Sequence, residues 1–461
     1  MDKFQPHQQR VIDKLIKTPE HGVIAYHSLG SGKTLTALGA ADAILRDNPR
    51  KKALFVVPAS LKTNVYDELK KHRLNKLKNK IDVMSYERAA NIAPELAKRH
   101  YALTVFDEAH RLRNKDTKRV TELKNVADKS GKLLLLTGTA GYNHPVDVMS
   151  LISIINPKER VPKTRSEFEG LYVDSEAWKL KNKDRLAKLL NRYIDKYDTP
   201  RNTSDFPSVT RKTIKVEMSP EQASMYKSVE KDIPAELRRK LKDNASMSLQ
   251  EASRLNVFSQ GVRQVSDSMA HHDISADYTS SPKMQVAAQH MISAAKNTPG
   301  FRGVAYSNYI DAGLVPYAKA LEDHGIKPLV FTGKLNAKEK AALIDEYNSK
   351  SSKPKVLLLS SSGSEGINLK RTRLMQVLEP HFNASKIKQA EGRAIRFKSH
   401  EDLPKAERNV VVENYQSTLP KTRWQKFWGL KANTSIDPYL ADLSAKKQGI
   451  VDEMNKLLTS K

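Results

Sequence analysis

The chain has 461 residues, of which 39% are hydrophobic, so it can bury the cores of two or three domains and is not a disordered protein. Its 79 Lys and Arg residues outnumber 52 Asp and Glu residues, and the net charge of +27 favours nucleic acid as a partner. The absence of cysteine excludes disulfides, thiolate metal sites and cysteine nucleophiles. No apolar run approaches the ~18–20 residues of a membrane span, and the N-terminus lacks a secretory signal, so we expect a cytoplasmic protein without membrane contacts.

Short apolar runs alternate with longer helical segments in two parts of the chain. In the first part the runs are 23–25, 53–57, 102–106 and 133–136. In the second part they are 304–306, 328–331, 356–359, 375–378 and 410–412. Apolar strands separated by helices are typical of parallel sheets that are covered on both faces. The pattern therefore predicts an α/β fold with two parallel-sheet domains in tandem.

We expect four parts along the chain. Residues 1–160 and 281–420 are the two parallel-sheet domains. Residues 161–280 are rich in Lys, Asp, Ser and Asn, lack apolar runs, and are expected to form a mostly helical insertion and linker, with helices over 178–197 and 220–242. Residues 421–461 form a short C-terminal extension that includes an amphipathic helix near 436–458.

A glycine-rich segment, HSLGSGKT, follows the first predicted strand and precedes a predicted helix. Gly30 and Gly32 allow backbone N–H groups to turn inward around a phosphate, and the helix N-terminus adds partial positive charge. Lys33 would reach the β- and γ-phosphates of a nucleotide, and the Thr34 hydroxyl would bind Mg²⁺. The strict form of this loop has glycine six residues before the lysine, where this chain has His27.

Two acidic residues end the predicted strand over 102–106. Ligand chemistry in open α/β sheets occurs at the carboxyl ends of the strands, so Asp107 is expected near Mg²⁺ and Glu108 where it can orient or deprotonate an attacking water. His110 would couple the site to neighbouring elements. A pair of helix-capping acids is the alternative interpretation of the same residues.

Four residues near position 390 are spaced as if on one face of a helix. Gln389, Gly392, Arg393 and Arg396 stand at i, i+3, i+4 and i+7. Two arginines one turn apart can clamp the charge that develops on a transferred phosphate. A solvated basic helix face is the alternative in so basic a chain.

These segments resemble, in the same order, the motifs of the Swi/Snf-like group of superfamily II helicases and translocases, above all the compact versions of bacteriophages and large DNA viruses. In the first half the matching segments are FQPHQ at 4–8, the glycine-rich loop, PASL at 58–61, SYE at 85–87, DEAHRLRN at 107–114 and LTGTA at 136–140. In the second half they are VAYS at 304–307, SSSGSEGINL at 360–369 and QAEGRAIR at 389–396. The resemblance spans nearly the whole chain.

The resemblance implies two RecA-like domains that bind ATP and Mg²⁺ in the cleft between them. The implied ATP-binding residues are Gln8, Leu29, Gly30, Ser31, Gly32, Lys33 and Thr34. The implied catalytic residues are Lys33, Asp107, Glu108, Gln389, Arg393 and Arg396, with Thr34 and Asp107 on the metal. The implied coupling residues are His110, Thr137, Gly138 and Thr139. The implied contacts to the DNA backbone are Ser60, Lys62, Ser85, Tyr86, Ser307, Ser361 and Gly363.

The leading interpretation is an ATP-dependent DNA helicase or translocase that remodels or unwinds forked and branched DNA in phage or viral replication, recombination or repair. A transcription-associated ATPase that acts on polymerase complexes is the alternative. A basic nucleic-acid-binding scaffold with a decayed ATP site is a third interpretation, which the presence of Lys33, Asp107 and Arg396 opposes.

The expected partner is duplex, forked or branched DNA, bound without sequence preference. Replication, recombination or transcription proteins are further candidate partners, and a monomer is favoured. The aromatic residues Trp424, Phe427 and Trp428 are expected to pack against the second domain rather than to stack on bases.

Overall fold

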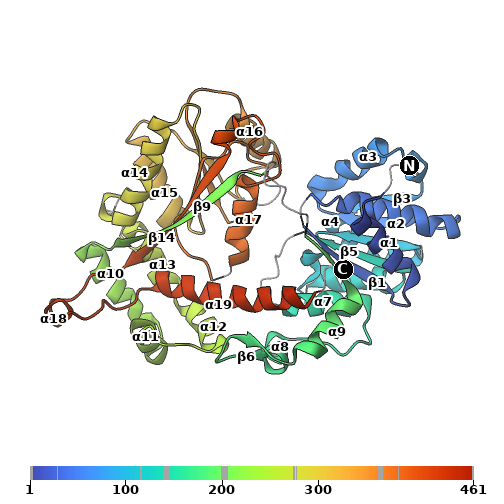
Figure 1. Ribbon diagram of the computed structural model, residues 1–461, viewed down its shortest axis with the longest axis horizontal. Helices are drawn as coiled ribbons and strands as arrows, with labels where there is room; N and C mark the ends of the chain where they lie inside the picture. The colour runs from blue at the N-terminus through green and yellow to red at the C-terminus, as the bar shows by residue number, and fades with distance from the viewer. Residues whose placement is uncertain are drawn as a thin grey trace. The chain divides into compact units, whose positions relative to one another are not determined.

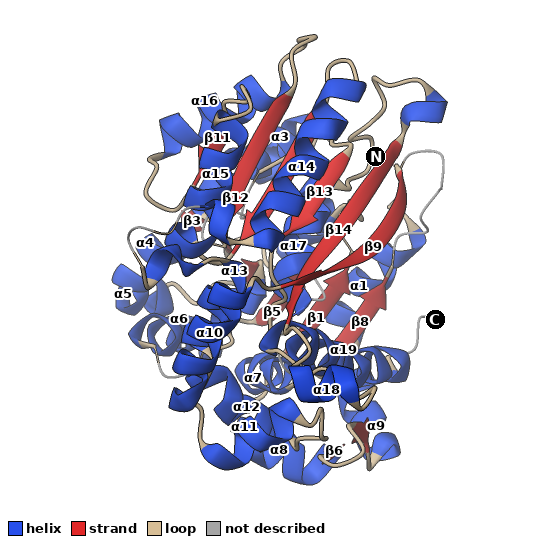
Figure 2. Ribbon diagram, turned by 90° about the vertical axis from the view of Figure 1, so that its left-hand side faces the viewer, coloured by secondary structure: helices blue, strands red, loops and turns tan. Residues whose placement is uncertain are grey.

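The computed structural model describes residues 4–28, 30–114, 117–138, 145–198, 206–273, 276, 278–361, 367–382 and 384–458, without the side chains of residues 337 and 384–386. The chain divides into two compact units, Met1–Pro200 with Gly449–Lys461, and Arg201–Gln448. Each is built around a parallel sheet, as predicted (Figures 1 and 2). No helix in the described ranges is both long and apolar enough to cross a membrane. The four-part division expected at 160, 280 and 420 stays a prediction.

The first unit contains a six-stranded sheet in which all paired strands are parallel. In spatial order its strands are β3 (Ile81–Ser85), β2 (Ala53–Val57), β4 (Leu103–Asp107), β5 (Lys132–Thr137), β1 (Gly22–His27) and β8 (Ile194–Tyr197). The four predicted strands of this part of the chain are β1, β2, β4 and β5, at adjacent places in the sheet. Because the strands are parallel, their carboxyl ends share one edge, where His27, Asp107 and Thr137 lie.

Helices cover this sheet with apolar side chains. The helices α1 (Pro6–Lys17), α2 (Lys33–Asp47) and α3 (Lys62–Lys71) share a buried cluster with alternate strand residues such as Val23 and Ala25. The other helices and a short hairpin are α4 (Tyr86–Asn91), α5 (Ala93–Lys98), α6 (Lys118–Asp128), α7 (Val146–Ile155), α8 (Arg165–Tyr172), β6 (Val173–Asp174), β7 (Lys179–Leu180) and α9 (Lys183–Tyr193). The core thus forms because alternate residues of a strand face opposite sides of the sheet.

The helix expected over 178–197 is wrong at both ends. Asn182 adopts a left-handed conformation (φ 51°), so α9 begins only at Lys183. Residues Ile194–Tyr197 leave the helix and pair with β1, because Ile24 to His27 provide a free row of backbone hydrogen-bonding groups on that side. A segment expected to belong to a helical insertion therefore supplies the edge strand of the first sheet.

The second unit contains another six-stranded parallel sheet. In spatial order its strands are β11 (Leu329–Phe331), β12 (Lys355–Ser360), β10 (Arg302–Ser307), β13 (Leu374–Val377), β14 (Asn409–Thr418) and β9 (Ser208–Glu217). All five predicted strands of this part of the chain are present. The strand β9 was not predicted, because its sequence SVTRKTIKVE is mostly polar; it lies at the sheet edge and pairs with β14 over its full length.

The helices of this unit cover both faces of its sheet. One face packs on α14 (Pro282–Asn297) and α15 (Val315–Glu322), and the other on α16 (Ala337–Asn348) and α17 (Ala384–Ala394). The others are α10 (Pro220–Val229), α11 (Ala235–Lys242), α12 (Leu249–Phe258), α13 (Gln260–Asp267), α18 (Arg423–Phe427) and the first part of α19 (Ile436–Leu457), which from Gly449 onward belongs to the first unit. The helix expected over 220–242 is divided into α10 and α11 at Pro234, which has no N–H group to continue a helix.

A buried cation joins three of these helices. Lys283 Nζ in α14 donates to Asp267 Oδ1 in α13 at 2.6 Å and to Asp437 Oδ2 in α19 at 2.8 Å, and none of the three side chains is more than 1% exposed. Burial alone would lower the pKa of Lys283, but the two carboxylates outweigh burial and hold that pKa above its ordinary value. The start of α19 is therefore fixed to α13 and α14 through one charged atom.

We predict that Lys283→Met lowers the free energy of unfolding of the second unit by about 3–5 kcal/mol, because two buried carboxylates lose their counter-charge. Urea denaturation followed by circular dichroism measures this change. The control is Lys319→Met, which removes an exposed lysine paired with Asp323 at i,i+4 and should have little effect on stability. Equal effects of the two substitutions would contradict the role assigned to Lys283.

Candidate nucleotide site

The glycine-rich loop lies at the carboxyl edge of the first sheet, between β1 and α2. Gly30 and Gly32 have φ values of 83° and 76°, a conformation that favours glycine. A Cβ atom at Gly32 would collide with Gln8 Nε2, so the Gln8 amide would have to move away to admit a side chain there. Gly32 is also the residue before α2, so the loop ends directly at a helix N-terminus. Leu29, predicted as part of this loop, lies outside the described residues.

Lys33 is the first residue of α2, and its side chain folds back over the loop. Its Nζ donates to the backbone carbonyls of His27 at 3.1 Å and Ser28 at 3.3 Å. The Ser31 hydroxyl oxygen is buried and has no partner among the described residues. Thr34, the second residue of α2, is partly exposed at the same helix end. The predicted phosphate-binding residues thus gather around the end of β1.

The two predicted acidic residues lie at the end of β4. Asp107 is 9% exposed, and burial together with the neighbouring Glu108 raises its pKa to about 6, against the opposing effect of Lys33. Glu108 adopts a left-handed conformation (φ 53°) at the turn into the 3-10 helix η3 (Ala109–Leu112). Its Oε2 lies 3.4 Å from His110 Nδ1. The acidic pair, Lys33 and His110 therefore interact within one site.

Thr137 lies between the glycine-rich loop and the acidic pair. It ends β5, which lies between β4 and β1, and its Cα pairs with that of Tyr26. The side chain is fully buried, and its Oγ1 has no partner among the described residues. Gly138 follows it with partial exposure, whereas Thr139 lies outside the described residues. Thr137 is thus placed where a coupling residue would contact both the loop and the acidic pair.

The start of α1 is attached to the same loop. Gln8 Nε2 donates to the Ser31 carbonyl at 3.2 Å, while Gln8 Oε1 accepts from the Gln5 backbone N–H at 3.0 Å. His7 Nε2 also contacts the Ser31 carbonyl, at 2.9 Å. Gln8, predicted to read the nucleotide base, therefore supports the backbone of the phosphate loop in this structure.

A buried carboxylate that sequence analysis did not single out lies beneath this loop. Asp195 in β8 accepts from Arg10 Nε at 2.6 Å and from His27 Nε2 at 2.8 Å. Burial alone would raise the pKa of Asp195, but the hydrogen bonds from His27 and Arg10 outweigh it and hold the pKa below its ordinary value. On the same strand, the Tyr197 ring stacks on His7 with centroids 3.7 Å apart. The histidine in place of the usual glycine is thus a structural partner of Asp195.

The first unit's residues fit a bound nucleotide with Mg²⁺. Burial and the neighbouring Glu108 raise the pKa of Asp107, and a divalent cation bound there would favour the charged form of its carboxylate. Carboxylate and hydroxyl oxygens such as those of Asp107 and Thr34 are the ligands that Mg²⁺ prefers. The hydroxyls of Ser31 and Thr137, which have no hydrogen-bond partner among the described residues, add polar groups at the same edge.

The predicted arginine pair lies in the second unit, and its expected helical geometry is wrong. Gln389 and Arg393 are on α17, but the helix ends at Ala394. The Arg396 N–H donates to Ser399 Oγ at 3.2 Å instead of continuing the helix. Arg396 therefore extends from the turn after α17, and burial lowers the pKa of its guanidinium.

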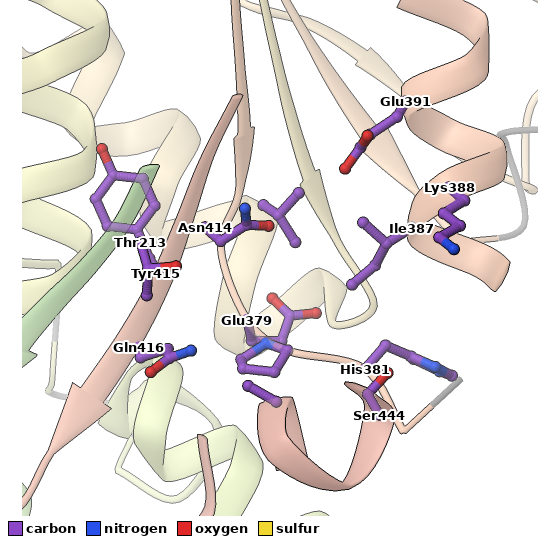
Figure 3. Close-up of a pocket in the computed structure, with 13 residues that line it drawn as sticks. Thr213, Glu379, His381, Ile387, Lys388, Glu391, Asn414, Tyr415, Gln416 and Ser444 are labelled. Carbon is purple, nitrogen blue, oxygen red and sulfur yellow. The ribbon is translucent and has the colours of Figure 1, made fainter. Parts of the chain in front are cut away.

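A hollow of about 230 Å³ lies behind α17 in the same unit (Figure 3). Glu391 and Lys388 reach it from α17, and Asn414 reaches it from β14. Glu391 also accepts from Arg211 of β9 at 2.7 Å. This ion pair ties the helix that carries Arg393 to the edge strand of the sheet.

Two of the predicted DNA contacts are buried, which contradicts a direct role for their side chains. Tyr86 is fully buried, and its hydroxyl donates to the Asp107 carbonyl at 2.7 Å. Ser307 is also fully buried and accepts from the Tyr309 backbone N–H at 3.0 Å. The motifs in which they stand predicted proximity to the site, but packing uses their side chains inside each unit. The other described candidates, Ser60, Lys62, Ser85 and Ser361, are exposed or partly exposed, and Gly363 lies outside the described residues.

Comparison with known proteins finds three family matches along the chain. Residues 73–270 match the SNF2-related domain, residues 2–141 match the res subunit of type III restriction enzymes, and residues 282–398 match the helicase conserved C-terminal domain. The chain contains an SNF2-related domain and a helicase C-terminal domain, which confirms its resemblance to the Swi/Snf-like helicases. Members of this family are ATP-hydrolysing enzymes, so the Swi/Snf-like chain described here is an ATPase.

Its relatives include viral and cellular proteins. A putative ATP-dependent RNA helicase of Acanthamoeba polyphaga mimivirus is 28% identical over 98% of this chain and 96% of its own length. A termination factor NPH-I homolog of African swine fever virus is 24% identical over 84% of this chain and 68% of its own length. A RAD54-like DNA repair and recombination protein of Gallus gallus is 26% identical over 82% of this chain and 59% of its own length. The Sulfolobus solfataricus SWI2/SNF2 ATPase core with dsDNA covers 90% of this Swi/Snf-like chain and 88% of its own, with 20% identity and a TM-score of 0.39.

We predict that Asp195→Asn lowers the free energy of unfolding of the first unit by about 1–3 kcal/mol, because the partly buried Arg10 guanidinium loses its charged partner. Urea denaturation measures the change. The control Asp13→Asn alters an exposed carboxylate of α1 and should have little effect. Because the pKa of Asp195 is lowered in the folded protein, its stabilisation is present at neutral pH and is lost as pH falls through that pKa. The difference between wild type and Asp195→Asn should therefore narrow in acid, and a constant difference would contradict this assignment.

Proposed function

We propose that this ATPase is a DNA helicase or translocase that couples hydrolysis to movement on duplex, forked or branched DNA during replication, recombination or repair. The observation that carries the proposal is the grouping of Lys33, Asp107, Glu108 and Thr137 at the carboxyl edge of the first sheet, within a chain that matches helicase-related families over most of residues 2–398.

In the proposed reaction, water attacks the γ-phosphorus of ATP, and ADP leaves. The Glu108 carboxylate orients this water and accepts its proton. The Lys33 ammonium neutralises the β- and γ-phosphate oxygens, while the N–H groups of the glycine-rich loop and of the start of α2 hold them. When bound, Mg²⁺ neutralises charge on the same oxygens, and Thr34 and Asp107 are the residues placed to hold it.

The net charge of this chain and one of its relatives favour DNA as the nucleic acid along which it moves. A net charge of +27 supports binding to a polyanion through its phosphates. The RAD54-like relative is described as a DNA repair and recombination protein. The mimivirus relative is described as a putative RNA helicase, so RNA must be included in any test.

A transcription-associated ATPase is the second candidate. The specific observation in its favour is the similarity to termination factor NPH-I homologs over 84% of this chain. Such a motor would be stimulated by a polymerase complex, whereas the first candidate needs only nucleic acid.

The deciding experiment is the steady-state ATPase rate with no nucleic acid and with single-stranded, duplex, forked and four-way DNA, and with RNA. We expect stimulation by duplex or branched DNA in wild type and a loss of about 10²–10⁴-fold in Glu108→Gln. Glu95→Gln, the same change at an exposed residue of α5, is the matched control and should retain the rate. Stimulation by RNA alone, or by no nucleic acid at all, would contradict the proposal.

A second prediction separates nucleotide binding from turnover. Lys33→Ala should lose both, because the ammonium contacts the phosphates of bound ATP. Arg396→Ala should keep nucleotide affinity but lose turnover on the order of 10³-fold, because an arginine finger acts on charge that develops in the transition state. Binding of a fluorescent ATP analogue and single-turnover hydrolysis distinguish the two. Equal losses of affinity and rate in Arg396→Ala would contradict the finger role.

A further inference from the structure

The loop between β14 and α19 exposes three aromatic side chains. Trp424, Phe427 and Trp428, in and just after α18, are 65%, 80% and 61% exposed. The expectation that they pack against the second domain is therefore wrong. Figure 1 shows α18 at the far end of this loop, away from α14 and α15 of its own unit. Side chains of this size are rarely left in water without a partner in the functional state.

This exposure is built into a well-defined local structure. Thr422 and Gln425 form a capping box at the start of α18. At its end, the Leu430 N–H donates to the Gln425 carbonyl and the Gly429 N–H to the Lys426 carbonyl, with Gly429 at φ 63°, which is a Schellman motif. Hydrogen bonds thus fix the backbone of the single helical turn at both ends, which places the three aromatic residues on one short, defined segment.

The three rings leave their faces open. The Trp424 and Trp428 rings are 6.2 Å apart and inclined at 55°, and the Phe427 and Trp428 rings are 5.2 Å apart and inclined at 87°. Such tilted and edge-to-face contacts hold the cluster together while no two rings stack face to face. A flat apolar ligand can therefore stack on them.

Exposed cations alternate with these rings. Lys421, Arg423, Lys426 and Lys431 are all exposed, and in the described part of the chain none of them lies within ion-pair distance of a carboxylate. The sequence has no acidic residue between Glu413 and Asp437. Aromatic faces next to unpaired cations are what bind unpaired bases and their phosphates.

We propose that residues 421–431, the aromatic loop, bind single-stranded DNA by stacking Trp424, Phe427 and Trp428 on unpaired bases while the four cations contact the phosphates. The inference rests on the proposed function as a DNA motor and adds a second DNA site outside the predicted motifs. Base faces are open in single strands and covered in duplex DNA, so the aromatic loop gives this motor a preference for forks and gaps over blunt duplex.

Tryptophan fluorescence tests the contact directly. The chain has three tryptophans, and the one outside the loop, Trp178, is 7% exposed in the first unit. In a Trp178→Phe protein the emission therefore reports only Trp424 and Trp428. We expect quenching by oligothymidine of about 15 nucleotides and little quenching by an abasic oligomer of the same length and charge. Equal quenching by both oligomers would overturn the stacking proposal.

Affinity measurements on variants provide the second test. We expect the triple variant Trp424→Ala/Phe427→Ala/Trp428→Ala to bind single-stranded and forked DNA about 5- to 150-fold more weakly, with blunt-duplex affinity and basal ATPase unchanged. Trp424→Phe/Trp428→Phe keeps the rings and should restore most of the affinity. Phe258→Ala, which removes an exposed aromatic side chain of α12, is the control.

These outcomes are separable from those of the proposed function. If the triple variant binds every DNA like wild type while wild-type ATPase is still stimulated by DNA, the aromatic loop proposal fails and the motor assignment stands. If the loop variant instead loses stimulation by a protein partner with all DNA affinities unchanged, the loop is a protein-docking element and the proposal is overturned. Absence of DNA stimulation in wild type is the failure of the proposed function itself.

Discussion

The nucleotide site depends on one ion pair at the edge of the first sheet, in which Asp195 is buried and Arg10 is partly buried. Asp195 binds Arg10 of α1 and His27 at the end of β1, so a single carboxylate fixes a helix and a strand relative to each other. The helix fixed in this way carries Gln8, which donates to the carbonyl of Ser31. The phosphate loop is therefore held at its start by the hydrogen bond between His27 and Asp195, and at Ser31 by the Gln8 amide. A parallel strand added at the sheet edge provides the anchor for both.

Two buried carboxylates of the first unit have opposite pKa shifts, and the contrast separates structure from chemistry. Asp195 has its cationic and imidazole partners within 3 Å, so its pKa is lowered and its charge is satisfied by the protein. Asp107 is buried beside another carboxylate and its pKa is raised to about 6, so its charge is not fully compensated by the protein. A bound cation can therefore stabilise the charged form of Asp107, whereas Asp195 is already stabilised by Arg10 and His27. Buried carboxylates of this under-compensated kind are where an added cation binds.

Apolar patterning predicted nine strands and the α/β class, and motif spacing predicted which residues gather around the end of β1. It missed β3, β8 and β9, because these strands pair along sheet edges and mix polar with apolar residues instead of forming continuous apolar runs. Asp195 was missed with β8, since a lone acid in a lysine-rich segment carries no local signal of its distant partners. The position of Arg396 differed for another reason. The Arg396 N–H donates to the Ser399 hydroxyl instead of to a carbonyl of the preceding helical turn, and hydrophobic periodicity does not reveal such an alternative acceptor.

The net charge of +27 indicates a polyanionic partner only if the cations are exposed, and the structure shows that some of them are buried. Lys283 and Arg302 are at most 1% exposed, and Arg302 donates to backbone carbonyls such as those of Tyr347 and Ser349. These buried cations stabilise the second unit and cannot contact DNA. The cations of the aromatic loop differ in being exposed, without a carboxylate among the described residues, and next to open aromatic faces. Binding to nucleic acid therefore depends on whether the cations are exposed and on whether aromatic faces lie beside them. The aromatic loop meets both conditions within eleven residues.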